Sequence, residues 1–462
     1  MISIILAGGA GIRLWPLSRK FWPKFLIKLP YEKYTLLQKT FLRVKSFTDV
    51  EKIFVVVNKE HKFLVKENIQ DLGIKFPIEN ILAEPEIKNT LPAVTFVCSV
   101  IKEKYSSEEI ISVFPSDHFI KDEKKFARFI KKAVNIAKKG PIVLFGIKPT
   151  RVETGYGHIE TNEKFDEDSF YIKRFIEKPD FETAKSLSVL DNVYWNSGIF
   201  VFSLKTFFEE LKIYQPEIYK FFLEKNFETK LEKIYSQLPN IPIDKGLIEK
   251  TKNVVVIPLG ILWDDLGSWA AIERIYQKDN QGNIILAKNV DIGSKNIIVV
   301  GDRRVVATCG LEDVIVVDTE DALLVINKNF DQKVKDIVEK ISDETVLYHK
   351  TVQRPWGFYT VLKQEKGYKV KLINVLPNKK LSLQKHKKRA EQWFVVKGVA
   401  KITCNNKVFY LKQNETLRIE KNTPHRLENP SSKNILEIIE VAYGSYLGED
   451  DIIRLEDDFG RK

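Results

Sequence analysis

From residue 1 to about 270, the chain alternates between two hydrophobic patterns. Short apolar runs at 110–115 (IISVFP), 141–147 (PIVLFGI) and 253–259 (NVVVIPL) are typical of buried strands. Between such runs, residues 36–47 and 126–139 carry apolar side chains at helical spacing. This alternation predicts an α/β sheet covered on both faces, with ligands bound at the carboxyl ends of the strands.

The pattern changes after residue 275. From 276 to 345, short apolar strands are separated at nearly regular intervals by turn sequences such as DIGSKN, GDRR and GLED. This spacing predicts a small β-solenoid-like connector. From 346 to 462, many short strands with polar turns predict an antiparallel β-barrel or jelly roll. The expected domains are therefore 1–275, 276–345 and 346–462.

Composition excludes several classes of protein. The formal net charge is +12, but the lysines are interleaved with acids, as in EKIFVVVNKEHKFLVKEN (51–68), so no basic stripe predicts a nucleic-acid partner. The positive field can still attract small anionic substrates. The 3 cysteines are scattered, which predicts no disulfide framework and fits a reducing cytoplasm. No apolar run reaches the roughly 20 residues that span a membrane.

The strongest motif is LAGGAGIRLWPLSRKFWPK, residues 6–24. A strand ends at Ala7, and a turn containing Gly8, Gly9 and Gly11 can close backbone N–H groups around phosphate oxygens. The motif lacks the Gly-Lys-Ser/Thr of a Walker loop and the glycine spacing of a dinucleotide fingerprint. A glycine turn after a strand is most often only a turn. The cations Arg13 and Lys24 change that interpretation, because two cations can neutralise charge that develops on a leaving pyrophosphate.

This segment resembles the signature of sugar-nucleotide pyrophosphorylases, and its WPLSR…PK form resembles mannose-1-phosphate guanylyltransferases. Further motifs follow in the family's order: AEPEIKNTLPAV (83–94), FPSDHFI (114–120), TGYGHIE (154–160), FIEKPD (175–180), WNSGIFVF (195–202) and WDDLGSW (263–269). The resemblance implies a Rossmann-like mixed-sheet nucleotidyltransferase that transfers GMP from GTP to mannose-1-phosphate, giving GDP-mannose and pyrophosphate. One departure is Ile12, where the family usually carries a small hydroxylated residue.

The resemblance also implies roles for residues in these motifs. Asp117 and Asp265 follow strand-like runs, and two carboxylates at strand ends can share one Mg²⁺, so they become the expected metal pair. An aspartate in such a place is at least as often a turn residue or helix cap. The sugar-phosphate side is assigned to Glu177, Lys178 and Asn196, backed by Gly157, and the nucleobase side to the 83–90 loop with Glu84 and Asn89. The choice of guanine rests on the resemblance alone.

A second informative stretch is LSLQKHKKRAEQWFVVKGVAKITC, residues 381–404. Gln384 and His386 are two residues apart on an expected strand, so both side chains face one way. Glu391 follows, and His425 comes from another strand after the turn NTP. These four side chains offer ligands for Zn²⁺ or a harder divalent ion. A lone histidine on a half-buried strand is more often simply packed, and only the whole constellation favours a metal.

This region resembles the cupin domain of type II mannose-6-phosphate isomerases, on the motifs RPWG (354–357), RAEQW (389–393) and the stretch 446–461. The resemblance implies interconversion of mannose-6-phosphate and fructose-6-phosphate, in which a metal polarises the sugar oxygens and a base moves a proton. Arg389 is the expected contact for the substrate phosphate or the enediolate. The departures from the family are Lys387, Lys388 and Gln392, at positions where histidine is common.

Other functions stay open at this point. The C-terminal barrel can be structural or sugar-sensing behind a monofunctional guanylyltransferase. The N-terminal part can use another base or sugar, or can bind nucleotide sugars without catalysis. Intact Arg13, Lys24 and metal carboxylates argue against a non-catalytic protein. The expected setting is GDP-mannose supply for polysaccharide biosynthesis in the cytoplasm, without a membrane or nucleic-acid partner, and a homodimer is left open.

Overall fold

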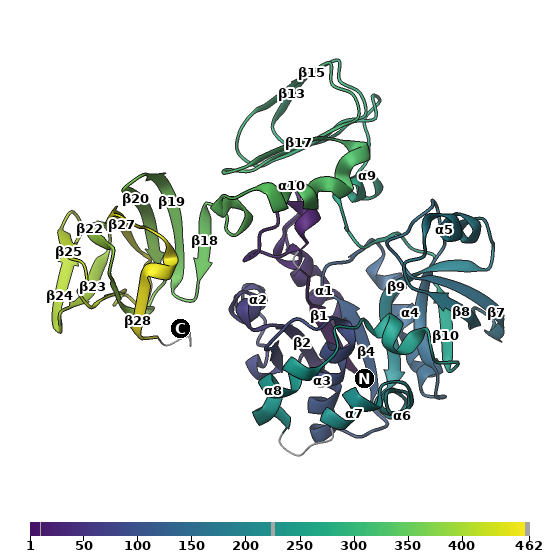
Figure 1. Cartoon of the computed structure of the whole chain (residues 1–462). Helices are drawn as coiled ribbons and strands as arrows, with labels where there is room; N and C mark the ends of the chain where they lie inside the picture. The colour runs from purple at the N-terminus through teal and green to yellow at the C-terminus, as the bar shows by residue number, and fades with distance from the viewer. Residues whose placement is uncertain (10, 223–226, 458–462) are drawn as a thin grey trace. The chain divides into compact units, whose positions relative to one another are not determined.

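The computed structural model of the chain describes residues 1–9, 11–222 and 227–457 (Figure 1). Residue 10, inside the glycine turn, and residues 458–462, at the end of the stretch 446–461 and of the expected C-terminal domain, lie outside the described residues. The chain divides into two compact units, Met1–Ser342 and Asp343–Lys462. Among the described residues, no helix is both long and apolar enough to cross a membrane.

Within the described residues, the first unit is built on a nine-stranded mixed sheet in the order β3-β2-β1-β4-β9-β6-β10-β8-β7. One half is parallel, β1 with β2 and β4, and β2 with β3; β6 and β10 also pair in parallel. β9 pairs antiparallel with β4, β6 and β7. β8 pairs antiparallel with β7 and β10. The strands are β1 (Ile2–Ala7), β2 (Ile53–Asn58), β3 (Ile81–Glu84), β4 (Ile110–Pro115), β6 (Ile142–Ile147), β7 (His158–Asp166), β8 (Ser169–Ile176), β9 (Val193–Ser203) and β10 (Val254–Pro258).

Both faces of the sheet are buried, as the continuous apolar runs predict. Along β1, Ile2 and Ile4 pack into one hydrophobic core, while Ile5 and Ala7 pack into the other. The first core is closed by α3 (Thr90–Lys104), α6 (Leu204–Tyr214), α7 (Pro216–Phe221) and α8 (Leu231–Gln237). The second is closed by α1 (Leu36–Lys45), α2 (Lys62–Gln70) and α4 (Glu123–Ala137). A further helix, α5 (Phe181–Ser188), follows β8. The mixed α/β nucleotidyltransferase architecture is confirmed.

The expected solenoid-like connector is a parallel β-helix at the end of the first unit (Figure 1). Strands β12, β14 and β16 stack in parallel on one side, and β13 and β15 on the other, while β17 closes the end antiparallel to β16. Short helices α9 (Ile272–Ile275) and α10 (Val334–Lys340) flank it. The strands are β12 (Ile284–Leu286), β13 (Asn289–Ile292), β14 (Ile298–Gly301), β15 (Val306–Cys309), β16 (Val314–Asp318) and β17 (Leu323–Asn327).

One apolar face of the β-helix packs against residues 12–29, the arm that follows the glycine turn. Ile298 and Ile315 share a core with Trp15 and Leu29 of the arm and with Trp269, which follows the WDDLG stretch. The Trp269 indole N–H donates to the Trp15 carbonyl at 3.0 Å. At the edge of this contact, Arg19 forms a 2.9 Å ion pair with Asp321. The β-helix therefore holds the arm that carries Lys24.

The second unit is a jelly roll of two β-sheets, which confirms the cupin expectation. In its described part, six strands form the order β18-β19-β20-β27-β22-β25 and five form β24-β23-β26-β21-β28. Apolar residues such as Val375, Trp393 and Ile438 fill the core between them. The strands are β18 (Thr351–Arg354), β19 (Gly357–Glu365), β20 (Tyr368–Val375), β21 (Leu383–His386), β22 (Arg389–Lys397), β23 (Val399–Cys404), β24 (Lys407–Lys412), β25 (Thr416–Ile419), β26 (His425–Glu428), β27 (Leu436–Gly444) and β28 (Ile452–Glu456).

Because the β-helix and the arm share a core, we predict that the β-helix stabilises the whole first unit. Ile315→Ala should lower the free energy of unfolding of that unit by about 2–5 kcal/mol, through lost burial and a residual cavity. Leu323→Ala, at a 57% exposed position on the adjacent strand, should change it by less than about 0.5 kcal/mol. Urea unfolding followed by tryptophan fluorescence measures both. An unchanged midpoint in Ile315→Ala would show that the β-helix unfolds independently.

Candidate functional site

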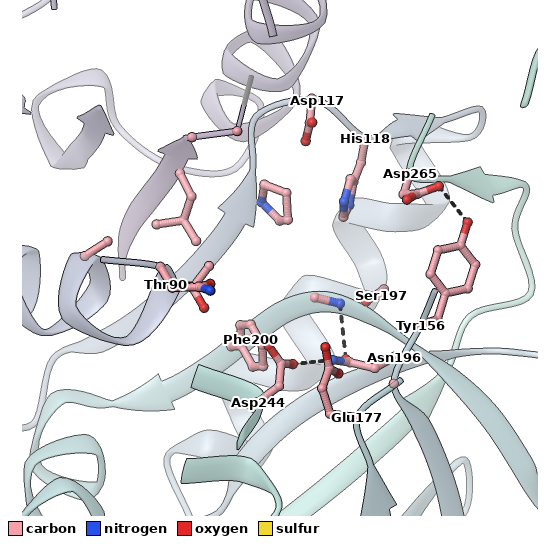
Figure 2. Close-up of a pocket in the computed structure, with 18 of the residues that line it drawn as sticks. Thr90, Asp117, His118, Tyr156, Glu177, Asn196, Ser197, Phe200, Asp244 and Asp265 are labelled. Carbon is pink, nitrogen blue, oxygen red and sulfur yellow. Dashed lines mark hydrogen bonds between the residues drawn. The ribbon is translucent and has the colours of Figure 1, made fainter. Parts of the chain in front are cut away.

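A cavity of about 560 Å³ opens at the carboxyl ends of β1 and β4, which are parallel neighbours in the sheet (Figure 2). The structure brings most of the predicted nucleotide, sugar and metal residues to its wall. Those that line it are Gly8, Gly9, Glu84, Asn89, Asp117, Gly157, Glu177, Lys178, Asn196 and Asp265. Gly11, Arg13 and Lys24 are not part of this wall. The edge of the sheet is the one that the strand pattern predicts for a ligand.

The glycine turn is shaped by close approach as well as by backbone dihedrals. Gly9 and Gly11 have φ values of 87° and 63°, in the region that favours glycine. A Cβ on Gly11 would lie 2.2 Å from the Cβ of Lys24. Any side chain there would therefore push away the segment that carries Lys24. Gly11 is needed to seat Lys24 beside the turn, although Gly11 itself does not line the cavity.

Lys24 lies between the two predicted metal carboxylates. Its buried Nζ forms a 2.7 Å ion pair with Asp117 Oδ2 and also donates to the backbone carbonyl of Asp265. A short ribbon of β5 (Phe119–Ile120) and β11 (Trp263–Asp264) pairs the segments after Asp117 and before Asp265. The ribbon explains why residues almost 150 positions apart meet at one cavity.

The two neighbouring aspartates in WDDLGSW have different roles. Asp264 is buried at 2% exposure, pairs with Arg274 through a 3.0 Å hydrogen bond from Nη2, and accepts the Leu266 N–H at 2.8 Å. It is a structural residue. Asp265 lines the cavity and accepts the Tyr156 hydroxyl at 2.6 Å (Figure 2). Burial alone would raise the pKa of Asp265, but the charge of Lys24 and the Tyr156 hydrogen bond outweigh burial and hold that pKa below its usual value.

His118 completes this side of the cavity, next to Asp117 and Asp265 in Figure 2. The Trp263 indole donates to His118 Nδ1 at 3.2 Å, so the imidazole accepts there and carries its proton on Nε2. Burial, only partly offset by Asp117, lowers the pKa of His118 to about 4. His118 is thus a neutral hydrogen-bond donor at physiological pH.

The predicted sugar residues gather at another part of the wall, where Figure 2 shows Glu177, Asn196 and Asp244 together. Asn196 Nδ2 donates to Asp244 Oδ1 at 2.7 Å, and its Oδ1 accepts the Gly198 N–H at 3.1 Å. Burial and the nearby Glu177 charge raise the pKa of Asp244 to about 7. A Cβ on Gly157 would lie 2.8 Å from Glu177 Oε2, so this glycine leaves room for the carboxylate.

On the expected nucleobase side, Glu84 and Asn89 line the cavity and also have structural contacts. Tyr235 donates its hydroxyl to Glu84 Oε1 at 3.2 Å, and burial raises the pKa of this carboxyl to about 7. Asn89 has a φ of 70° and caps α3, because its side-chain oxygen accepts the Thr90 N–H at 3.0 Å. The loop therefore places the N-terminus of α3 at the cavity wall.

A second cluster lies inside the jelly roll. His386 ends β21, Glu391 lies on β22 and His425 begins β26, and all three are about 1% exposed. Their ligand atoms lie within 4.8 Å of one another: His386 Nε2 is 3.0 Å from Glu391 Oε1, and His425 Nε2 is 3.6 Å from Glu391 Oε2. Gln384 pairs with His425 across the adjacent strands. β21 and β26 are neighbours in the five-stranded sheet, whereas β22 belongs to the six-stranded sheet, so the predicted ligand residues come from both sheets of the jelly roll.

The nitrogen and oxygen atoms of this cluster are suited to binding a metal ion. His425 Nδ1 lies 2.8 Å from the Thr423 carbonyl and donates to it, which leaves a lone pair on Nε2. His386 Nε2 and His425 Nε2 lie close to Glu391, but neither atom, nor His386 Nδ1, makes a hydrogen bond of good geometry within the described residues, and all three atoms are buried. Such atoms are costly to bury unless a cation or water satisfies them. Two orphaned imidazoles beside a buried carboxylate are the ligand chemistry of a divalent ion.

Arg389 is tied to the same carboxylate. Its Nε donates to Glu391 Oε1 at 3.2 Å and its Nη1 to the Gly448 carbonyl at 2.9 Å, while Trp393 donates to Glu391 Oε2 at 3.1 Å. These contacts orient Glu391 toward the histidines.

Three family models match consecutive parts of the chain. The nucleotidyl transferase family model matches residues 2–282. The β-helix region, 287–341, matches the MannoseP isomerase/GMP-like beta-helix domain, and residues 341–457 match the mannose-6-phosphate isomerase C-terminal family. The chain belongs to the nucleotidyl transferase family. The resemblance to guanylyltransferases with an isomerase domain is confirmed.

Relatives of this nucleotidyl transferase match its whole length. Xanthan biosynthesis protein XanB of Xanthomonas campestris is 40% identical over 473 residues, covering 100% of this chain and 99% of the relative. Mannose-1-phosphate guanylyltransferase of Salmonella montevideo is 39% identical over 475 residues, with 99% of each chain covered. A crystal structure named mannose-1-phosphate geranyltransferase, from Thermus thermophilus, aligns with a TM-score of 0.68 at 29% identity and covers 74% of this chain and 99% of that one.

The structure adds residues that the sequence motifs did not single out, and among the described residues it shows no polar contact with the cavity residues for one predicted residue, Arg13. Tyr156 and His118 lie inside the recognised motifs TGYGHIE and FPSDHFI, so the motifs carried a signal for both. Asp244, in the short turn Asp244–Ile248, had no such signal. Arg13 is exposed and does not line the cavity, so its catalytic role stays a prediction.

The barrel cluster predicts selective metal retention. After stripping and reloading with Zn²⁺, the chain should keep about one equivalent through gel filtration, held by the two histidines and Glu391. His386→Ala and His425→Ala should lose it, and His61→Ala, an imidazole in the first unit, should keep it. Elemental analysis of the protein peak measures the metal. Full retention in both barrel variants would show that the cluster is not the binding site.

Proposed function

We propose that the first unit transfers the guanylyl group of GTP to mannose-1-phosphate, releasing pyrophosphate and forming GDP-mannose. The observation that carries this proposal is the meeting of Lys24, Asp117 and Asp265 at the cavity beside the glycine turn. Phosphoryl-type transfer needs little covalent chemistry from a protein and depends on position and charge. Cation, carboxylates and backbone N–H groups are the groups that such a reaction needs.

Mg²⁺ is the proposed cofactor of this site. Asp117 and Asp265 offer the carboxylate oxygens that it prefers, and the lowered pKa of Asp265 keeps that carboxylate ionised at neutral pH. When bound, the ion would neutralise charge on the reacting phosphates. Lys24, held between the same two residues, screens the triphosphate, while Gly8 and Gly9 let backbone N–H groups approach its oxygens. We assign Arg13 to the leaving pyrophosphate, as the family motif implies.

The sugar phosphate is proposed to bind on the side of Glu177, Lys178 and Asn196. Asn196 is held by Asp244 and by the Gly198 N–H, so its amide is fixed before substrate arrives. Lys178 has an exposed Nζ that lies 3.3 Å from Glu177 Oε1, and it supplies a cation for the phosphate at the cavity edge. Glu84 and Asn89 are assigned to the nucleobase side. The choice of guanine is supported by the relatives' names.

The barrel is proposed to interconvert mannose-6-phosphate and fructose-6-phosphate. His386, Glu391 and His425, with Gln384 beside His425 as the fourth ligand, would hold Zn²⁺ or another divalent ion, which would polarise the sugar oxygens. Arg389 is assigned to the substrate phosphate or the enediolate. The isomerase proposal is supported by where the three residues that depart from the family pattern lie. Lys387 and Lys388 are exposed, and Gln392 alternates with the buried Glu391 and Trp393, so it faces away from the ligands.

These departures therefore leave the ligand set untouched, and a barrel that is only structural or sugar-sensing is not favoured. The functional division into 1–275, 276–345 and 346–462 is part of the proposal. So is a cytoplasmic location, which the similarity to polysaccharide-biosynthesis relatives supports. A homodimer stays a prediction from the sequence.

The adjacent aspartates give a matched test of the transferase site. Asp265→Asn should lower kcat for GTP-dependent pyrophosphate release at least about 100-fold, because it removes a charge from the cavity at nearly constant shape. Asp264→Asn should keep turnover and lower the free energy of unfolding by about 2 kcal/mol, because it breaks the partly exposed pair with Arg274. Steady-state kinetics and urea unfolding separate the two. Equal turnover losses in both variants would refute the assignment.

A further inference from the structure

The jelly-roll interior carries charges that the metal cluster does not use. Side chains alternate along each strand, so Lys369, Lys371, Ile373 and Val375 of β20 share the inward face. On β27, Ile438 and Glu440 share it as well. One end of the interior is therefore filled by apolar residues of the core, and the other end by charged residues. The metal cluster lies at the charged end: Trp393 pairs with Glu440 across β22 and β27, and Glu391, on the same face as Trp393, pairs with Ala442, which lies beyond Glu440 from the apolar end.

Lys371 is the most unusual of these charged residues. Its side chain is only 7% exposed, and a buried ammonium is costly unless anions compensate it. Its Nζ lies 2.7 Å from Glu449 Oε1, 3.8 Å from Glu440 Oε1 and 4.6 Å from the centre of the Tyr359 ring. Glu440 Oε1 is itself buried with no hydrogen-bond partner in the described residues. The group is thus built around the cation of Lys371.

Glu449 reaches this cation from outside the barrel strands. It lies on the short turn Glu449–Asp451, between β27 and β28, and its side chain is 26% exposed. Burial alone would raise the pKa of Glu449, but the charges of Lys371 and Arg354 outweigh burial and hold that pKa well below its usual value. One carboxylate from a half-exposed segment therefore occupies a place that cations have made favourable for an anion.

The place is linked to the metal cluster through one side chain. Arg389 donates to Glu391 Oε1 with Nε and to the Gly448 carbonyl, next to Glu449, with Nη1. Arg354 approaches from β18 and stacks on Tyr348 and Tyr359, at 5.4 and 5.5 Å from their ring centres. The charged end of the barrel thus has a metal cluster on one side of Arg389 and the Lys371 cation on the other.

We propose that Lys371 and Arg354 bind the phosphate monoester of the hexose phosphate in the barrel, and that Glu449 occupies this subsite until substrate displaces its carboxylate. The inference rests on the proposed isomerase function, whose substrates carry a phosphate at one end and the reacting carbons at the other. A phosphate dianion offers more charge and more acceptor oxygens than a carboxylate, so it can compete for an ammonium and a guanidinium. The metal cluster is then free to hold the reacting end.

The two possible roles of Glu449, a carboxylate that substrate displaces and a purely structural ion-pair partner, lead to different effects of removing its charge. If Glu449 only braces the turn between β27 and β28, removing its charge weakens the fold and does not help any ligand. If Glu449 competes with substrate, removing its charge strengthens substrate binding. The chain offers a matched structural pair in the same unit: Lys401 and Glu428 form a 3.0 Å ion pair on adjacent strands β23 and β26.

The test measures binding of fructose-6-phosphate, fructose and inorganic phosphate to the full, metal-loaded chain by equilibrium dialysis. Saturating GDP-mannose keeps the transferase site filled. Lys371→Met should weaken fructose-6-phosphate binding at least tenfold and leave fructose unchanged, because only the phosphate loses a partner. Glu449→Gln should tighten fructose-6-phosphate binding several-fold. Lys401→Met and Glu428→Gln should stay within twofold of the natural chain. Inorganic phosphate should compete with fructose-6-phosphate, and more weakly in Lys371→Met.

Several results would overturn the proposal. One such result is a Glu449→Gln variant that unfolds at the same temperature as the unsubstituted chain and binds fructose-6-phosphate no more tightly. Glu449 would then be only a structural partner of Lys371. Equal weakening of fructose and fructose-6-phosphate in Lys371→Met would remove the phosphate from this subsite. The proposal would also be wrong if inorganic phosphate bound without competing with fructose-6-phosphate. It would be wrong as well if the unsubstituted chain bound no fructose-6-phosphate. The dialysis assay measures binding and does not depend on catalysis. If the variants bind in the expected pattern but the chain does not isomerise the sugar phosphate, the proposed isomerase function is wrong and the phosphate subsite stands.

Discussion

The ion pair between Lys24 and Asp117 depends on three parts of the first unit at once. The strand and glycine turn supply the site, Gly11 leaves the space that a Cβ would fill, and the β-helix packs on the arm that carries Lys24. Removing any of these would let a buried lysine move away from the two carboxylates. The β-helix therefore supports the proposed transferase site, although none of its described residues lines the cavity.

The jelly roll reaches a charged site by a different route. Alternation turns every second residue of a strand inward, and along this inward face the residue type changes from charged, such as Lys371, to apolar, such as Ile373. One wall of side chains therefore provides both the core and the site. Lone pairs on buried imidazoles need a cation, and the buried cation of Lys371 needs an anion. The two requirements are met on either side of Arg389, which holds Glu391 and the segment before Glu449.

The sequence was sufficient for the architecture, because short continuous apolar runs that alternate with helical patterns favour a sheet covered on both faces. It was sufficient for the residues that sit inside motifs, such as Asp117 and Asn196, whose place at the cavity the structure shows. It could not find Asp244, since its role comes from contact with Asn196, 48 positions away. Nor could it find Lys371, because the segment YKVKLINV is a typical half-buried strand in which a lysine is expected to be solvated.

We propose that one chain carries two sites, each with its own metal and its own chemistry. The most direct measurement is conversion of fructose-6-phosphate to mannose-6-phosphate by purified chain that has been stripped of metal and reloaded with Zn²⁺, Co²⁺, Mn²⁺ or Mg²⁺. His386→Ala and Asp265→Asn are assayed beside it, with GTP-dependent pyrophosphate release as the second readout. We expect metal-dependent isomerisation that His386→Ala loses and Asp265→Asn keeps, and pyrophosphate release that Asp265→Asn loses and His386→Ala keeps. No isomerisation with any metal, in a chain that still releases pyrophosphate, would contradict this proposal.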